Sequence, residues 1–309
     1  MRVEKTRVMF FGTPLFASKA LENIYNFGFN VCGVITQPTK KSGRGALPKP
    51  SQVMETASKL KLLVYQPLSN DELFNITSQI NPDIIVVAAY GKVIPDNILA
   101  IPCYGALNIH GSLLPKYRGP SPIPTAILNG DRETGITVIK MTNKLDAGPI
   151  VSKVKVQLDP KETTSTLYEK LAEAGANEIV QIIPRYINGE VDVLPQDEEK
   201  ATYCTMIRKE DGLIDWRRSA TDIERQIRAF IPWPNAFTSW DGKMLKILEG
   251  QIEKKVLEPG YVVVLNRGLI IGCGKDSINI TRVQIEDKNE MLITDFLNGY
   301  RKIDGAILH

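Results

Sequence analysis

Val8-Met9-Phe10-Phe11-Gly12-Thr13-Pro14 is an apolar run that stops at a glycine turn near the start of the chain. Four successive apolar residues predict a buried strand, while Thr13 suits a helix N-cap and Pro14 the first helical position. Apolar residues at helical spacing continue to Gly28, and a second apolar run, Val31–Thr36, follows at once. This order of strand, helix and strand predicts a βαβ unit within an open α/β sheet.

Three further apolar runs extend the predicted sheet: Ile84–Ala89, Leu107–Ile109 and Ile136–Ile139. The first is apolar throughout, which is typical of a parallel strand covered on both faces. The turn after the first strand contains a single glycine, Gly12. A dinucleotide pyrophosphate needs two further glycines for close approach of the backbone, so this turn argues against a nicotinamide-dependent oxidoreductase.

A long helix and a polar segment follow the predicted sheet. Thr166 and Glu169 have the spacing of a capping box, which predicts a helix running towards Tyr186, and Pro184 is expected to end or kink it. Residues 188–207 are largely polar, with little periodicity. We therefore expect these residues to form a linker between two domains.

The expected domains are residues 1–187 and residues 208–309, which suits a chain of 309 residues. In the second domain, Thr221–Glu224 is expected to open a short helix with one apolar face. From Ala236 to about Thr281, short β-runs alternate with glycine-containing turns. Such spacing predicts a small barrel or sandwich.

The composition matches a soluble globular protein, with 43% hydrophobic residues, 24% charged residues and a net charge of +3. No apolar run approaches the length of a membrane span, and no signal peptide is recognisable. The four cysteines are far apart and form no CxxC pair, as expected for reduced thiols and not for a metal site. These features predict a cytoplasmic protein without a bound metal or membrane contact.

The strongest candidate for chemistry is the stretch Asn108 to Pro115, which reads Asn-Ile-His-Gly-Ser-Leu-Leu-Pro. Asn108 and His110 are two residues apart on a predicted strand, so their side chains share one face. The following turn places them at the carboxyl end of the strand, where open α/β sheets bind ligands. His110 is also the only histidine besides the last residue, His309. A buried histidine with a satisfied hydrogen bond is the alternative interpretation.

Asp146 follows the predicted strand Ile136–Ile139 and precedes Ala147-Gly148-Pro149. An aspartate in such a loop often bonds only to its own backbone. Because it follows a strand of the same sheet, Asp146 can also meet His110, which would favour a catalytic role.

The segment Pro38 to Pro50 carries Lys40, Lys41, Arg44 and Lys49 without any acidic residue. It can be a solvated surface loop. Arginine and lysine between glycines also suit contact with a phosphate-bearing partner, so Lys40, Lys41 and Arg44 are candidate nucleic-acid contacts.

Together these segments resemble the methionyl-tRNA formyltransferase family. The resemblance covers nearly the whole chain and rests on Phe11–Pro14, Thr36–Pro38, Gly43–Gly45, Ala89–Gly91, Asn108–Pro115, Arg118-Gly119, Gly130-Asp131, Glu133–Gly135, Met141-Thr142, Leu145-Asp146, Ile214–Trp216, Gln226–Phe230 and Pro232–Pro234. The stretch Asn108 to Pro115 with a later aspartate is shared by folate-dependent formyl transferases and hydrolases. The Gly-Arg-Gly loop and the tryptophan-containing second domain are narrower signals.

The resemblance implies a Rossmann-like formyltransferase domain followed by a small OB-like β-barrel that binds tRNA. It implies 10-formyltetrahydrofolate as the formyl donor and initiator Met-tRNA as the formyl acceptor. It also implies that the enzyme is a monomer. Asn108, His110 and Asp146 fall on the family's catalytic positions, and Ser112, Leu113, Leu114 and Pro115 fall on its folate-contacting turn.

These residues suit formyl transfer, in which an amine attacks a carbonyl and creates an oxyanion. Asn108 offers a neutral N–H and His110, when protonated, a charged one. Asp146 would favour the cationic form of His110 and help to take the amine proton.

Three rival functions remain open at this point. A sugar-nucleotide formyltransferase would share the first domain but should lack the basic loop. A formyltetrahydrofolate hydrolase would use the same three residues on water. A non-catalytic RNA-binding protein would use the second domain alone, and the intact Asn108, His110 and Asp146 argue against it.

Overall fold

The computed structural model describes residues 5–39 and 50–309. Lys40, Lys41, Arg44 and Lys49 therefore lie outside the described residues. The chain divides into two compact units, unit 1 formed by Met1–Pro122, Glu133–Gln157 and Tyr168–Cys204, and unit 2 formed by Ile123–Arg132, Leu158–Leu167 and Thr205–His309.

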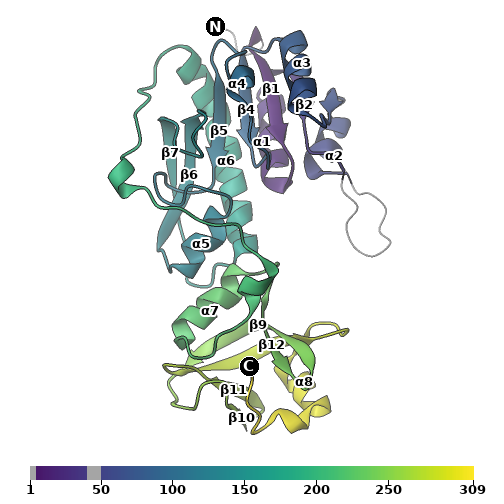
Figure 1. Ribbon diagram of the computed structural model, residues 1–309, viewed down its shortest axis with the longest axis vertical. Coiled ribbons are helices and arrows are strands. Elements are labelled where there is room, and N and C mark those ends of the chain that lie inside the picture. Colours follow the sequence, from purple (N-terminus) through teal and green to yellow (C-terminus); the bar gives the residue numbers. More distant parts are fainter. Residues whose placement is uncertain (1–4, 40–49) are drawn as a thin grey trace. The chain divides into compact units, whose positions relative to one another are not determined.

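Unit 1 contains a seven-stranded sheet with the strand order β3-β2-β1-β4-β5-β6-β7 (Figure 1). Its strands are β1 (Arg7–Gly12), β2 (Asn30–Ile35), β3 (Val64–Tyr65), β4 (Ile84–Ala88), β5 (Ala106–His110), β6 (Glu133–Lys140) and β7 (Ile150–Gln157). The strands β1 to β5 are parallel, which confirms the predicted α/β sheet. The two remaining strands differ from the expected βαβ series, because β6 is antiparallel to both β5 and β7. The sheet is therefore mixed.

Helices and short 3-10 turns connect the strands within the two units. The α-helices are α1 (Leu15–Asn26), α2 (Gln52–Lys59), α3 (Asn70–Ile80), α4 (Asp96–Leu99), α5 (Pro122–Leu128), α6 (Thr164–Ile187), α7 (Ala220–Ala229) and α8 (Ile293–Gly299). The 3-10 turns are η2 (Glu198–Lys200), η3 (Lys209–Gly212) and η4 (Arg301–Ile303). Helix α6 packs on β5, where a Cβ added to Gly175 would lie 2.8 Å from Ile109. Among the described residues, no helix combines the length and apolar character needed to cross a bilayer.

The starts of two expected helices were wrong, whereas the expected run of α6 towards Tyr186 is confirmed. Pro14, not Thr13, is the N-cap of α1, and the Thr13 hydroxyl donates instead to the Tyr90 carbonyl at 3.3 Å. Helix α6 begins two residues before Thr166, whose N–H donates to the Thr163 hydroxyl at 3.2 Å. Pro184 does not end α6, which continues to Ile187. A proline close to a helix end removes only one late hydrogen bond, so the helix can continue past it for a few residues.

Unit 2 contains a six-stranded antiparallel sheet with the order β10-β11-β12-β9-β8, and β13 also pairs with β12. Its strands are β8 (Ala236–Trp240), β9 (Lys243–Glu253), β10 (Val262–Leu265), β11 (Gly268–Gly272), β12 (Ser277–Ile285) and β13 (Met291–Leu292). The turn Asp241-Gly242 separates β8 from β9, as predicted. The turn between β10 and β11 is Asn266-Arg267, one residue before the predicted break at Arg267-Gly268, because Gly268 is already the first residue of β11.

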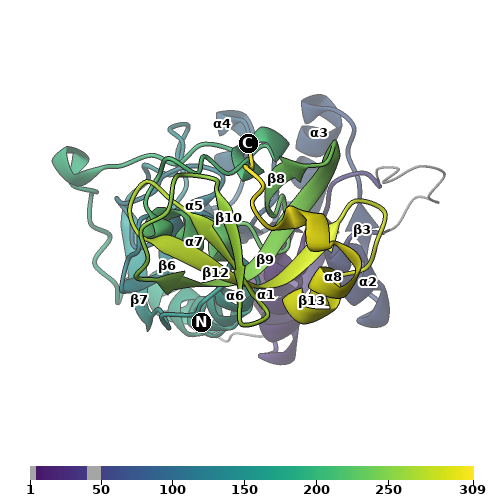
Figure 2. The ribbon, with the colours of Figure 1, turned by 90° about the horizontal axis from the view of Figure 1, so that it is seen from below.

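The last residues of the chain connect the two edges of this sheet. The Ser239 N–H of β8 donates to the His309 carbonyl at 3.3 Å, and the Val262 N–H of β10 donates to the Ala306 carbonyl at 2.9 Å. Figure 2 shows the C-terminus beside β8. This tail therefore connects the two edge strands, β8 and β10, of the antiparallel sheet.

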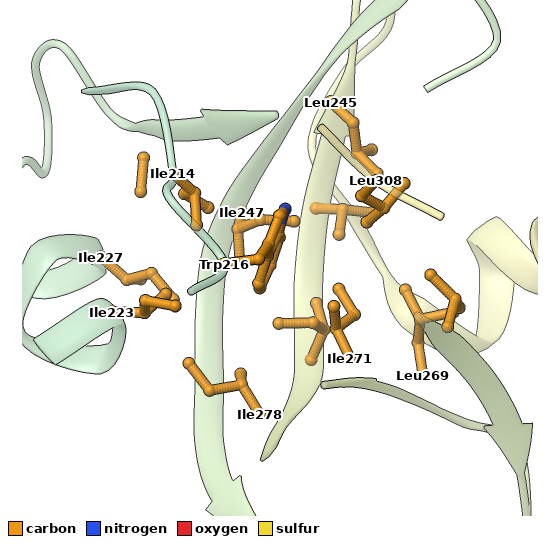
Figure 3. Packing of buried hydrophobic residues seen from close by; sticks show 14 of the residues in the cluster. Ile214, Trp216, Ile223, Ile227, Leu245, Ile247, Leu269, Ile271, Ile278 and Leu308 are labelled. Carbon is orange, nitrogen blue, oxygen red and sulfur yellow. The ribbon is translucent and has the colours of Figure 1, made fainter. Parts of the chain in front are cut away.

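Trp216 lies at the centre of the unit 2 core (Figure 3). Its ring is surrounded by aliphatic side chains from the sheet and from α7, among them Ile247, Ile271 and Ile223. The indole N–H donates to the buried Thr238 hydroxyl at 3.2 Å, so its polar atom is satisfied within the core.

Candidate active site

The carboxyl end of β5 places the first two candidate residues. β5 pairs with β4 on one side and β6 on the other, and Asn108 and His110 lie in its last three positions. His110 is only 6% exposed, and its Nε2 lies 3.0 Å from the Tyr117 carbonyl oxygen. A carbonyl can only accept, so Nε2 carries the proton in this hydrogen bond.

Asp146 lies in the loop between β6 and β7 and faces both residues of β5. Its Oδ2 is 3.6 Å from His110 Nδ1 and accepts from the Gly119 N–H at 2.9 Å. Its Oδ1 accepts from Asn108 Nδ2 at 3.4 Å. The three residues expected to act together are therefore brought together in unit 1.

The backbone around Asp146 is strained. Asp146 itself has a φ of 48°, a left-handed conformation that costs a non-glycine residue about 1–3 kcal/mol. Two residues further on, a Cβ at Gly148 would lie 1.9 Å from the Lys140 carbonyl oxygen, so the loop returns closely along the end of β6. Such a conformation persists only where surrounding contacts hold it in place.

Burial controls the protonation of His110. Loss of solvation lowers the pKa of His110 below its ordinary 6.5, although the Asp146 carboxylate and the Tyr117 carbonyl both act to raise it. Pairing with Asp146 alone would favour a cationic imidazole, as expected from the sequence, but the effect of burial on the pKa of His110 is larger. With Nε2 protonated, a neutral His110 presents an unprotonated Nδ1 towards Asp146. Nδ1 can therefore accept a proton.

The turn that follows β5 divides into buried and accessible residues. Ser112 is fully buried and its hydroxyl donates to the Lys116 carbonyl at 2.6 Å. Leu114 is also fully buried, and its N–H donates to the Thr137 hydroxyl at 3.0 Å. Leu113 and Pro115 are half-buried. These two keep surface that a ligand can contact, while Ser112 and Leu114 shape the turn.

Several residues of this site were not assigned a role from the sequence. The Gly119 N–H orients Asp146, and the Tyr117 carbonyl fixes the His110 ring. Gln196 donates to the Asp146 carbonyl at 2.7 Å, although residues 188–207 were expected to form a linker. In unit 1, the segment up to Cys204 packs beside the site. A polar residue in a non-periodic segment gives no local sign of such a contact.

The described residues contain no group of three or more histidine, cysteine, aspartate or glutamate side chains arranged to hold a metal ion. The four cysteines are free thiols.

Comparison with known proteins identifies the class. A family model described as formyl transferase matches residues 5–183, and a second, described as formyl transferase C-terminal domain, matches residues 206–301. Methionyl-tRNA formyltransferase of Caldanaerobacter subterraneus is 40% identical over 307 residues, covering 98% of this chain and 99% of the relative. The chain therefore belongs to the methionyl-tRNA formyltransferase family.

Solved structures share the fold. Methionyl-tRNA formyltransferase from Clostridium thermocellum aligns with a TM-score of 0.54 at 19% identity, covering 80% of this chain and 94% of that chain. The N-formyltransferase from Helicobacter canadensis in complex with folinic acid and dTDP-3-aminofucose aligns with a TM-score of 0.68 at 20% identity, covering 89% of this chain and 98% of that chain. At these identities the alignments describe the fold alone.

Proposed function

We propose that this protein transfers the formyl group of 10-formyltetrahydrofolate to the amino group of methionine on initiator Met-tRNA. The observation that carries the proposal is the meeting of Asn108, His110 and Asp146 at the carboxyl edge of the sheet. The Asp146 carboxylate lies 3.4 Å from Asn108 Nδ2 and 3.6 Å from His110 Nδ1. The full-length similarity to methionyl-tRNA formyltransferases supports the acceptor.

His110 is proposed as the proton acceptor. As the methionine amine attacks the formyl carbon, a C–N bond forms and Nδ1 takes the proton that the amine releases. When the bond between the formyl carbon and the folate nitrogen breaks, the same proton passes from Nδ1 to that nitrogen. Asp146 stabilises the imidazolium during the interval in which His110 is charged.

Asn108 is proposed to stabilise the oxyanion formed by this attack. Its amide carries two N–H groups, so one can hold Asp146 while the other donates to the developing charge. Removing one such donor typically costs about 2.7–4 kcal/mol of transition-state stabilisation.

We also propose which residues contact the formyl donor, folate, and the formyl acceptor, tRNA. Leu113 and Pro115 would contact the folate directly, on a turn shaped by Ser112 and Leu114. Lys40, Lys41 and Arg44 would contact tRNA phosphates. We further propose that the enzyme acts as a monomer in the cytoplasm.

The activity can be tested with formyl-labelled donor offered separately with charged initiator tRNA, a UDP-amino sugar, or water. We expect label in the tRNA alone. Label in the sugar would indicate a sugar-nucleotide formyltransferase, and release as formate without an acceptor would indicate a hydrolase. Retention of all label in the donor would contradict an enzymatic function.

Arg44 offers a test of the basic segment. Arg44→Ala should raise the KM for tRNA and lower turnover, and it should weaken the salt dependence because fewer counterions are released on binding. Arg44→Lys should restore the activity only in part, since lysine keeps the charge but lacks the forked donors. Initial rates against tRNA at two salt concentrations measure both effects, with the folate KM as an internal control. Identical rates and salt slopes in all three proteins would show that the segment has no part in tRNA binding.

A further inference from the structure

Gln196 is joined to the loop that carries Asp146 by both of its amide hydrogens. Nε2 donates to the Asp146 carbonyl at 2.7 Å and to the Gly148 carbonyl at 2.8 Å. These two carbonyls flank the Asp146–Ala147–Gly148 backbone, which contains the left-handed Asp146. Gln196 is 8% exposed, so water cannot readily replace these bonds.

The other end of the Gln196 amide is held by Arg118. Oε1 accepts from Arg118 Nε at 3.0 Å and from Arg118 Nη2 at 2.8 Å, so both lone pairs of the oxygen are used. With two donated and two accepted bonds, the amide can adopt only one orientation, because a flipped amide would set donors against Arg118 and an oxygen against two carbonyls.

Arg118 is itself fixed on the remaining sides. Its guanidinium is 1% exposed and forms a bidentate pair with Glu198, with Nη1–Oε2 and Nη2–Oε1 distances of 2.8 Å. Nη1 also donates to the Tyr203 hydroxyl at 3.3 Å. Arg118 is connected to Asp146 by two routes. Along the chain it directly precedes Gly119, whose N–H donates to the Asp146 carboxylate. Through its side chain it binds Gln196, which donates to the Asp146 carbonyl.

We propose that Gln196 is a positioning residue that holds the strained Asp146 loop so that the carboxylate faces His110 Nδ1. Its role in turnover rests on the proposed formyl transfer, whereas its effect on the placement of Asp146 does not. Asp146 is held at its side chain and at its backbone. The Gly119 N–H donates to the carboxylate oxygen Oδ2, and Gln196 donates to the main-chain carbonyl oxygen of the same residue. Without Gln196, the loop loses two bonds that oppose relaxation of the φ of 48°.

Two substitutions of similar size distinguish positioning of the Asp146 loop from a role that is limited to holding the Arg118 side chain. Gln196→Glu keeps both acceptors for Arg118 and adds a favourable charge, but its second carboxylate oxygen faces the carbonyls of Asp146 and Gly148 and repels them. Gln196→Met loses all four hydrogen bonds of the Gln196 amide and places no charge beside the carbonyls of Asp146 and Gly148. If Gln196 positions the loop, Gln196→Glu should be at least as impaired as Gln196→Met. If it serves only to hold Arg118, Gln196→Glu should resemble the wild type.

The expected effect is on turnover. Misplacement of a reacting group by about 1 Å can cost around 100-fold in rate, so we expect kcat to fall by about 10- to 100-fold in both variants. The KM for folate and for tRNA should change by less than about threefold, since Gln196 faces Asp146 and Arg118 and not the residues proposed to bind them. Rates are expressed per mole of protein that binds 5-formyltetrahydrofolate, which corrects for misfolded material. Gln181→Glu, the same change on an exposed position of α6, is the matched control and should keep wild-type kcat.

A second measurement does not depend on any assumed substrate. Because the chain has two histidines, their NMR signals should be simple to assign, and the His110 imidazole should report the nearby carboxylate. Gln196→Met introduces no charge, and we expect it to shift the His110 titration to lower pH, in the same direction as Asp146→Asn. An unchanged His110 titration together with wild-type kcat in Gln196→Glu would overturn the proposal. If the wild type transfers no formyl group to tRNA, the proposed function fails, and the titration still tests the placement of Asp146.

Discussion

His110→Ala should reduce formyl transfer to charged initiator tRNA by several hundred-fold or more. The substitution removes the unprotonated Nδ1 that faces Asp146, and general base catalysis typically contributes on the order of 100- to 10,000-fold. Binding of a folate analogue and of tRNA should be largely kept, because the ring is 6% exposed and contacts its own chain. Single-turnover rates with labelled donor measure the chemical step directly.

His110→Gln distinguishes a chemical role from a structural one. A glutamine amide can reproduce the Nε2 donor to the Tyr117 carbonyl, but it has no basic atom at the position of Nδ1. We therefore expect His110→Gln to be about as inactive as His110→Ala. His309→Ala is the matched control, since His309 is exposed and its carbonyl, which accepts from Thr238, is retained. Turnover of His110→Gln within tenfold of the wild type would show that His110 has a structural role.

The sheet could be predicted largely from the sequence, because its central strands are short apolar runs with well-marked turns. Ile84–Ala89 was expected to be buried on both faces. All five residues of β4, Ile84–Ala88, are buried, and only Ala89, which follows the strand, is exposed. The direction of β6 could not be predicted. The run Ile136–Ile139 has the same pattern in either direction, since an apolar run records burial and not the orientation of its neighbour.

The proximity of Asn108, His110 and Asp146 could be predicted, but the hydrogen bonds that hold them could not. Asn108 and His110 share a face because of their spacing on one strand, and Asp146 follows a strand of the same sheet. Gln196 is 50 residues from Asp146 and 78 residues from Arg118. Contacts at such separation are set by tertiary packing, and the polar segment around Gln196 has no periodicity that would indicate burial.

The lowered pKa of His110 also depends on tertiary structure. From the sequence, pairing with Asp146 suggested a cation, because a nearby carboxylate raises the pKa of an imidazole. The 3.6 Å separation weakens this effect, while burial of the ring lowers the pKa of His110 further than the carboxylate raises it. The difference matters for mechanism, since a cation can only donate a proton whereas the neutral ring can accept one.

Asp146→Asn should reduce formyl transfer by on the order of 100- to 10,000-fold, for two reasons. The neutral amide cannot stabilise the imidazolium that forms when His110 accepts the proton. It also has a single acceptor oxygen, whereas Asp146 accepts from the Gly119 N–H and from Asn108. One of these donors must lose its partner, and Asn108 is the more weakly held, at 3.4 Å. The change therefore disturbs the residue proposed to bind the oxyanion as well.

The same variant should lower the pKa of His110 further. Burial already lowers the pKa of His110 below 6.5, and the Asp146 charge raises it in part. Removal of this charge therefore lets burial lower the pKa further. NMR titration of the imidazole measures the pKa directly, which is preferable to a rate profile because an α-amino acceptor itself titrates near pH 7.7–8.0. Asp71→Asn, on the exposed first turn of α3, is the matched control and should change neither quantity. A higher pKa for His110 in Asp146→Asn would contradict the electrostatic assignment. An unchanged rate would remove Asp146 from the mechanism, because the carboxylate would then contribute only to the fold of its loop.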